Sequence, residues 1–317
     1  MPQTDPLTVI AGSTRNLPIE RDSSSHQKKT LIVIAGPTAS GKTSCAIKLA
    51  KALDTVILSA DSRQFYKEMS IGTAAPTKEE LSQAKHYFVH HISITDKYDV
   101  ADYERDALQL LDKLFKTHNT VIMTGGSGLF IDAVCNGIDI MPDVKPEIRE
   151  KVQKLYDDGG LTALQDEVQH LDPEYFAIVD QQNPRRLQRA LEVCYQTGQP
   201  FSSFRSGHSV QREFDIKKYA LLWNRQQLIE RIDKRVDMMM EQGLLEEAQT
   251  LYSQRHLNAL NTVGYKELFA FLDGQCTLAE AVEQIKIHTR QYAKRQMTWL
   301  RRDSSYQWIT PDQIIQI

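Results

Sequence analysis

The sequence has no long hydrophobic run and no excess of charge of either sign. None of its 317 residues lies in an apolar stretch of the ~18 residues that a membrane-spanning helix requires, so we expect no membrane contact. Near the start, only residues 7–11 are continuously apolar, and Arg15, Glu20 and Arg21 follow them. This pattern argues against a secretory signal.

Cysteine is also scarce. Cys45, Cys135, Cys194 and Cys276 are far apart in the chain and form no C-x-x-C pair. Structural zinc sites and redox dithiols need closely spaced cysteines, so the spacing argues against both. Unpaired thiols suit a reducing compartment, and we expect a cytoplasmic protein.

Charge is nearly balanced over the whole chain but not along it. The chain has 38 Lys and Arg against 41 Asp and Glu, a formal net charge of −3. Residues 181–317 alone have a net charge of +4, and the remainder has −7. A basic second half is a weak indication of an anionic partner.

Short β-branched apolar runs predict a parallel sheet that is buried on both faces. These runs occupy residues 30–35, 55–59, 120–124 and 219–223. Helical patterns over residues 43–53 and 101–115 separate the first three runs. This alternation predicts an α/β fold, a doubly wound parallel sheet with helices on both faces.

The segment between the third and fourth runs has a different texture, in which prolines separate amphipathic segments such as 147–157 and 161–170. We therefore predict a mainly helical insertion domain at residues 138–207. The expected division of the rest of the chain is a flexible N-terminal extension at 1–29 and a catalytic core at 30–137 and 208–317. Helical patterns at 228–251 and 279–300 predict a helical C-terminal region within that core.

A glycine-rich turn follows the first predicted strand and precedes the first predicted helix. It matches G-x-x-x-x-G-K-[ST] in full, with the residues Gly36, Pro37, Thr38, Ala39, Ser40, Gly41, Lys42 and Thr43. Backbone N–H groups of such a turn surround a phosphate, the lysine adds a positive charge, and the Thr43 hydroxyl suits a Mg²⁺ ion. The core is therefore expected to be P-loop NTPase-like and to bind a polyphosphate.

Asp61 follows the second predicted strand and is the candidate for chemistry. Its position at the carboxyl end of a strand, beside the phosphate turn, is where open α/β sheets place ligands. The residue fits a general base or a hydrogen-bond acceptor, and a solvated helix cap is the alternative. No acidic residue follows the third strand at 125–128, where a nucleotide hydrolase would normally hold Mg²⁺.

Taken together, the motifs resemble the tRNA dimethylallyltransferases, in the bacterial form without a C-terminal zinc finger. The resemblance covers roughly residues 31–305. It rests on segments 36–43, 59–66, 71–76, 89–91, 125–127, 183–193, 228–236, 262–265 and 294–301. The phosphate turn alone is shared with many kinases, whereas the ordered set is specific to this family.

The resemblance implies transfer of a dimethylallyl group from dimethylallyl diphosphate to the exocyclic amine of the adenosine 3′ of a tRNA anticodon. It implies that the turn, Mg²⁺ and either Arg231 or Arg235 hold the diphosphate, and that Asp61 accepts a hydrogen bond or proton from the amine. Ser127 stands where the family usually has Thr, in contact with the bridging phosphate oxygen or the base. Phe130 and Ala75 also depart from the family pattern. A monomer is the expected state.

Residues expected to contact tRNA form three groups. They are Asp61, Ser62, Arg63, Gln64 and Ser127 near the base; Arg149, Arg185, Arg186, Leu187, Gln188 and Arg189 in the insertion; and Lys294, Arg295, Gln296, Thr298, Trp299 and Arg301 near the C-terminus. Residues 286–302 contain six cationic residues and no acidic one, with Tyr292 and Trp299 between them, which favours RNA contact with stacking. A solvated face or a membrane-surface helix is the alternative.

Two other functions fit parts of the sequence. A small-molecule P-loop kinase would use the same turn for ATP, and an RNA-binding module could retain the turn without using it. His90 and His91 invite a metal site, but adjacent side chains diverge, so a structural role is favoured. The run Met238-Met-Met240 is interpreted as core.

Overall fold

Six parallel strands form one sheet in the part of the chain that the structure, a computed structural model, describes: residues 28–205, 207 and 210–317. The order across the sheet is β3-β2-β4-β1-β5-β6. The strands are β1 (Thr30–Ala35), β2 (Ile57–Ser59), β3 (His86–Tyr87), β4 (Thr120–Gly125), β5 (Asp215–Leu221) and β6 (Tyr306–Ile309). The predicted parallel sheet is confirmed.

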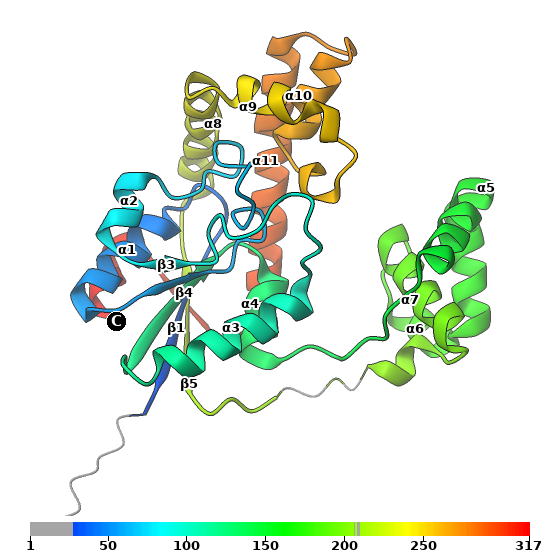
Figure 1. Ribbon diagram of the computed structural model, residues 1–317, viewed down its shortest axis with the longest axis horizontal. Helices are drawn as coiled ribbons and strands as arrows, with labels where there is room; N and C mark the ends of the chain where they lie inside the picture. Colours follow the sequence, from blue (N-terminus) through cyan, green and yellow to red (C-terminus); the bar gives the residue numbers. More distant parts are fainter. Residues whose placement is uncertain (1–27, 206, 208–209) are drawn as a thin grey trace, which may run out of the picture.

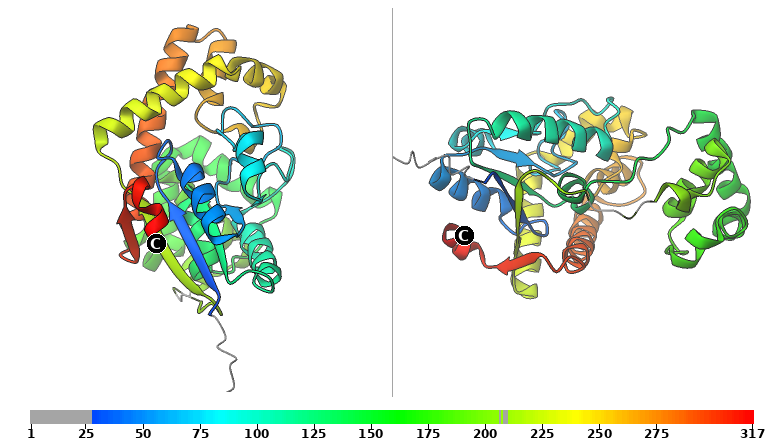
Figure 2. Two further views of the ribbon diagram at one scale, coloured as in Figure 1. Left: turned by 90° about the vertical axis from the view of Figure 1, so that its left-hand side faces the viewer. Right: turned by 90° about the horizontal axis from the view of Figure 1, so that it is seen from below.

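The central strand β1 shows why the sequence has continuous apolar runs. Leu31 and Val33 pack on one face of the sheet with α3 (Val100–Leu114) and α4 (Gly128–Asn136), while Ile32 and Ile34 pack on the other face with α1 (Lys42–Leu53). Successive side chains of a strand alternate between faces, so a strand covered on both sides must be apolar throughout. Figures 1 and 2 show these helices on either side of the sheet.

Among the described residues between α4 and β5, three α-helices form a separate body. They are α5 (Pro146–Leu171), α6 (Pro173–Ile178) and α7 (Pro184–Thr197), followed by the short helix η1 (Phe201–Phe204). Their apolar residues form a cluster of their own, which includes Leu164, Leu187 and Phe201. In Figure 1 this green group stands apart from the sheet, and the boundaries that we propose for the insertion domain remain 138–207.

The C-terminal half contains four further α-helices among the described residues. These are α8 (Arg225–Glu241), α9 (Leu244–Leu251), α10 (Tyr265–Leu272) and α11 (Leu278–Leu300). The predicted helical pattern over 228–251 is confirmed, and it divides into two helices because Gly243 has a φ of 98° and separates α8 from α9. Short helices complete the chain: α2 (Lys78–Gln83), η2 (Tyr252–Gln254), η3 (Asn258–Leu260) and η4 (Pro311–Gln316).

The two edge strands were not predicted from the sequence. β3 has two residues and β6 has four, and both are only partly apolar. Natural edge strands are often short and polar because this limits pairing with other chains, which also removes the sequence signal. The fourth predicted strand is shifted as well, since β5 ends at Leu221 and not at residue 223.

The proposed N-terminal extension lies almost wholly outside the described residues. Of its 29 positions only Lys28 and Lys29 are described, and both are attached to the core: Lys28 forms an ion pair with Asp215, and Lys29 donates to the Asn119 side chain. Among the described residues, no helix is long and apolar enough to cross a membrane.

Candidate active site

The phosphate turn has the backbone conformation that an anion nest requires. Gly41 has a φ of 84° and Ala39 a φ of 61°, so both lie in the left-handed region. The Lys42 ammonium donates to the Pro37 carbonyl at 2.8 Å, across the turn. The Ser40 hydroxyl is fully buried and has no hydrogen-bond partner among the described residues. Together with the parallel sheet, this turn gives the core a P-loop NTPase-like fold.

A cavity of about 490 Å³ opens beside this turn. It brings together residues that lie far apart in the sequence. Those predicted from the sequence that line it are Thr38, Ala39, Gly41, Lys42, Thr43, Asp61, Ser62, Arg63, Gln64, Arg235, Arg295 and Gln296. The phosphate turn, the candidate base and one of the candidate arginines therefore face a single space.

Three charged groups interact in this cavity. Burial lowers the pKa of Lys42 to about 8; the negative charge of Asp61 opposes this shift and the positive charge of Arg235 adds to it. Burial also lowers the pKa of Arg235, again against the attraction of Asp61. Two half-buried cations beside one carboxylate leave positive charge to be neutralised by an anionic ligand.

The two candidate arginines of α8 have different environments. Arg231 donates from Nε to the Ala39 carbonyl at 2.8 Å, and its guanidinium lies 4.3 Å from the centre of the Trp223 ring. Arg231 therefore holds the backbone of the turn and does not line the cavity. Arg235 lines the cavity itself. A guanidinium can bind two phosphate oxygens in one plane. Since Arg235 lines the cavity and Arg231 does not, Arg235 is the better placed of the two to contact a diphosphate.

Asp61 lies in a tight turn after β2 and does not cap a helix. Its Oδ1 accepts a hydrogen bond from the Arg63 backbone N–H at 3.2 Å, and no helix begins at this position. The Arg63 guanidinium donates to the carbonyls of Asn258 and Ala259. Because no helix begins at Asp61, the helix-cap alternative is removed. The Asp61 side chain is partly exposed and lines the cavity.

Ser127 contacts the Asp61 loop directly. Its hydroxyl accepts a hydrogen bond from the Ser62 backbone N–H at 3.0 Å and lies 3.2 Å from the Ser62 hydroxyl. A second, apolar cavity of about 250 Å³ begins at Ser127 and is bounded by Leu129, Phe130 and Trp299. The two cavities have Tyr292, Arg295 and Gln296 as common walls. Tyr292 is 36% exposed, and partial loss of water between the two cavities raises the pKa of its hydroxyl, to which the negative charge of Asp61 adds.

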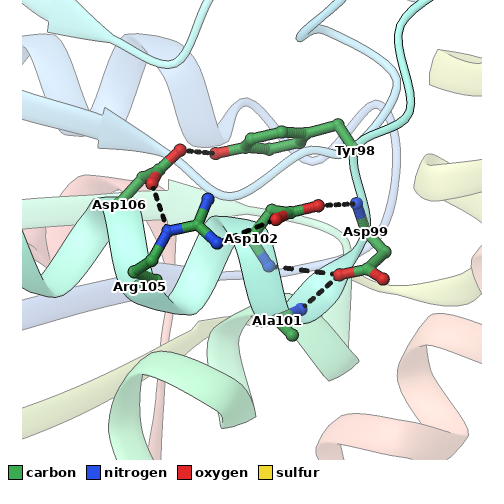
Figure 3. A network of polar contacts seen from close by, with 6 residues as sticks. All are labelled: Tyr98, Asp99, Ala101, Asp102, Arg105 and Asp106. Carbon is green, nitrogen blue, oxygen red and sulfur yellow. Dashed lines mark hydrogen bonds and ion pairs between the residues drawn. The ribbon is translucent and has the colours of Figure 1, made fainter. Parts of the chain in front are cut away.

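An aromatic cluster and a polar network pack against the loop that carries Asp61, through Phe65 of that loop. Phe65 stacks on Tyr103 at 5.3 Å between ring centres and makes edge contacts with His91 and Tyr98. The Tyr98 hydroxyl donates to Asp106 on α3, as Figure 3 shows. His91 is thus packed among aromatic rings, which favours its structural role. In the described residues no group of three or more His, Cys, Asp or Glu is placed to hold a metal.

The same network, shown in Figure 3, fixes the start of α3. Asp99 accepts from the backbone N–H groups of Ala101 and Asp102, Asp102 accepts from the Asp99 N–H, and Arg105 pairs with Asp102 and Asp106. Such reciprocal capping holds α3 in place. Through Tyr98 it also holds the aromatic cluster on which the Asp61 loop rests.

The basic stretch 286–302 divides into two parts. Lys286 pairs with Asp237, and Arg290 forms a two-pronged ion pair with Asp233, so both are bound to α8. Lys286 and Arg290 are two of the six cations counted in this stretch, and their ion pairs with α8 hold them within the protein. Lys294, Arg295, Thr298 and Arg301 are exposed, whereas Gln296 is buried. Fewer cations of this stretch are therefore free to contact RNA than the sequence indicates.

The insertion also requires a correction. Arg149, Arg185 and Arg186 are exposed, and Arg189 pairs with Glu192 on the same helix. Leu187, by contrast, is fully buried in the core of the insertion, so its side chain does not reach RNA. Gln188 is also buried and donates to Gln153. In both cases the pattern of a family motif does not distinguish contact residues from the core residues between them.

The sequence did not identify Glu247 on α9 as part of the site. Its carboxylate accepts hydrogen bonds from three consecutive backbone N–H groups, those of Ser70, Ile71 and Gly72, and from the Tyr265 hydroxyl. Gly72 and Thr73 line the main cavity, so Glu247 shapes its wall. One glutamate in a charged helix carries no sequence signal of such a role. Asn261 and Lys266 are further lining residues that were not predicted.

The Met238-Met-Met240 run is only partly core. Met239 and Met240 pack against the cluster formed by α8 to α11, whereas Met238 is exposed.

Comparisons with known proteins identify one family. A family model described as IPP transferase matches residues 64–303, more than half of the chain. The tRNA dimethylallyltransferase of Christiangramia forsetii is 51% identical over 283 residues, 89% of this chain and 94% of that protein. The tRNA dimethylallyltransferase 1 of Bacteroides fragilis is 49% identical over 285 residues, 90% of this chain and 95% of that protein.

Solved structures show the same likeness. A tRNA isopentenylpyrophosphate transferase from Bacillus halodurans has a TM-score of 0.67 at 32% identity and covers 91% of this chain and 94% of its own. A eukaryotic dimethylallyltransferase acting on tRNA has a TM-score of 0.75 at 25% identity and covers 89% of this chain and 74% of its own.

Proposed function

This chain belongs to the IPP transferase family, and we propose that it is a tRNA dimethylallyltransferase. In the proposed reaction it transfers the dimethylallyl group of dimethylallyl diphosphate to the exocyclic amine of the adenosine 3′-adjacent to the anticodon in tRNA, releasing diphosphate. One observation carries this proposal: Asp61, Lys42 and Arg235 face one cavity beside the phosphate turn.

The diphosphate of the donor would occupy the phosphate turn. Backbone N–H groups of the turn, the Lys42 ammonium and the Arg235 guanidinium supply the donors and positive charge that a leaving diphosphate needs. A Mg²⁺ ion fits the same place, because Thr43 offers a neutral oxygen and this ion is usually held by substrate phosphates, water and few protein groups. Bound there, Mg²⁺ would add further charge neutralisation to the diphosphate.

The chemistry follows from the position of Asp61. The amine nitrogen of the adenine attacks the first carbon of the dimethylallyl group, and the bond from that carbon to the diphosphate oxygen breaks with its electron pair. Diphosphate leaves, and the amine proton passes to the Asp61 carboxylate. The Ser127 hydroxyl, through its contact with Ser62, holds the Asp61 loop, and Ser127 lines the second, apolar cavity.

Exposed cations would hold the RNA. Lys294, Arg295 and Arg301 on and beside α11, with Arg149, Arg185 and Arg186 on the insertion, are in reach of solvent and suit phosphate contacts. The target base must leave the anticodon loop to reach Asp61. We further propose that the enzyme acts as a monomer in the cytoplasm.

A direct test incubates the protein with labelled dimethylallyl diphosphate, Mg²⁺ and an unmodified tRNA that has adenosine beside the anticodon. We expect label in the RNA and none in a matched tRNA with guanosine at that position. The P-loop kinase alternative predicts the opposite: no label in either RNA, together with hydrolysis of ATP or phosphorylation of a small molecule. That result would overturn the proposal.

A further inference from the structure

Helix α11 has an inner face that contacts both ligand-binding loops. Gln296 on this face is 7% exposed. Its Oε1 accepts a hydrogen bond from the Thr38 backbone N–H at 2.8 Å, and its Nε2 donates to the Gly126 carbonyl at 2.9 Å. One side chain thus joins the phosphate turn after β1 to the loop after β4.

The loop after β4 is built to admit this side chain. A Cβ atom at Gly126 would lie 2.3 Å from Gln296 Nε2, so only glycine allows the approach. The contact with α11 therefore explains the glycine at this position of the loop.

Trp299 repeats the arrangement one turn later. It lies three residues after Gln296, so both side chains share a helix face. Its Nε1 donates to Asp132 on α4 at 3.0 Å, and a Cβ atom at Gly128 would lie 2.4 Å from its ring. The inner face of α11 therefore holds the start of α4, where Ser127 stands.

The outer face of the same helix is exposed at Lys294 and Thr298, and Arg295 between them is exposed as well while it lines both cavities. Gln296 lies within this segment, which is why the sequence places it among the tRNA contacts. Both polar ends of its side chain are engaged by backbone groups of the protein. Its amide keeps one N–H and one lone pair after these two hydrogen bonds, but at 7% exposure little of the side chain can reach an RNA on the surface.

We propose that Gln296 is a positioning residue of the donor site and not a contact to tRNA. It holds the phosphate turn and the Ser127 loop in one register, so that the diphosphate and the acceptor base meet at the right distance. This inference rests on the proposed function, since it takes the turn as the diphosphate site. Small displacements at such a site reduce the rate strongly because reacting atoms must be aligned.

The variant Gln296→Met keeps the length and shape of the side chain and removes both hydrogen bonds. The Thr38 N–H and the Gly126 carbonyl lose their partner, and the turn gains freedom to shift. We expect the dissociation constant for inorganic pyrophosphate with Mg²⁺ to rise roughly tenfold, because the turn that surrounds the anion is no longer held in place by these hydrogen bonds. The dissociation constant for tRNA should stay within about twofold of the wild-type value, because no RNA contact is removed.

The experiment measures both dissociation constants and the melting temperature for the wild type, Gln296→Met, Gln296→Ala and Gln291→Ala. Gln291 is an exposed glutamine on the same helix and serves as the matched control. We expect the Met and Ala variants to lose pyrophosphate affinity while the control does not. The Met variant keeps the packing, so its binding data stand even if the Ala variant fails to fold.

Two outcomes would overturn the inference. The first is weaker tRNA binding by Gln296→Met with unchanged pyrophosphate affinity, which would make Gln296 an RNA contact. The second is a lower melting temperature with both affinities unchanged, which would make its role purely structural. The readout is independent of the transfer reaction: if the wild type fails to label tRNA, the proposed function fails while the pyrophosphate measurement still decides the role of Gln296.

Discussion

The hydroxyl of Ser127 accepts a hydrogen bond from the backbone N–H of Ser62 at 3.0 Å. This contact ties the loop after β4 to the loop that carries Asp61, across 65 positions of sequence. The two residues that the family pattern marks for catalysis therefore belong to one connected unit. Asp61 can be tested alone only with a substitution that leaves this unit intact.

The variant Asp61→Asn meets that condition, since asparagine keeps the oxygen that accepts from the Arg63 N–H. We expect kcat to fall by roughly 10²- to 10⁴-fold, the usual contribution of a general base, with little change in tRNA affinity. Single-turnover transfer and filter binding measure the two quantities. Asp112→Asn, an exposed aspartate on α3, is the control and should behave as the wild type. A wild-type rate for Asp61→Asn would remove this residue from the chemistry.

The lowered pKa of Lys42 predicts that binding of the diphosphate depends on pH. The free enzyme loses the Lys42 charge as pH rises through about 8. An anion binds the protonated form, so affinity for pyrophosphate should fall as pH rises from about 7.5 to 9.5, by at most about tenfold per pH unit. Calorimetry at constant Mg²⁺ measures this.

The comparison with Lys42→Met separates this effect from titration of the ligand, which is common to both proteins. We expect the variant to bind more weakly and to lack the component due to Lys42. Equal pH dependence in the two proteins would show that Lys42 keeps its charge over this range.

Basic residues of one helix should differ in their effect on RNA binding. Lys294 is exposed, whereas Lys286 pairs with Asp237. The variant Lys294→Ala should lower the slope of log K against log salt by roughly 0.7 to 0.9, the value for one phosphate contact. Lys286→Ala should leave the slope unchanged. If both variants lower it equally, α8 and α11 must separate when RNA binds.

Glu247 should matter for stability. Removal of its carboxylate by Glu247→Ala leaves three backbone N–H groups and the Tyr265 hydroxyl without their acceptor. We expect a loss of about 2 to 3 kcal/mol in the free energy of unfolding, measured with urea. Glu246→Ala, a neighbouring exposed glutamate, should change it by no more than about 0.5 kcal/mol. An equal effect of the two variants would contradict the role of Glu247.

Several features were predictable because their cause is local in the chain. The phosphate turn needs glycine at Gly41 for its φ of 84°, and a lysine and a hydroxyl directly after it, so the motif and the structure coincide. Strand β1 must be apolar on both faces, and the sequence shows an unbroken apolar run. Asp61 was found because it directly follows such a strand.

Other features depend on partners that are distant in the chain. In the sequence Arg290 is one of several cations that fit an RNA contact, but in the fold it pairs with Asp233 of α8. Leu187 lies within a basic motif of the sequence, but its side chain packs in the core of the insertion. The two arginines of α8 differ only because Arg231 meets Ala39 and Trp223 while Arg235 meets the cavity.

The sequence alone determined the fold class, the phosphate turn, the candidate base and, through the ordered motifs, the family resemblance. Each of these depends on residue types at short, set spacings, which the linear chain displays directly. Only the tertiary structure decided which polar side chains face the ligand and which hold the loops, as with Gln296. Hydrogen-bond donors and acceptors of the same type can serve either role, and the choice depends on which partner the fold brings within about 3 Å.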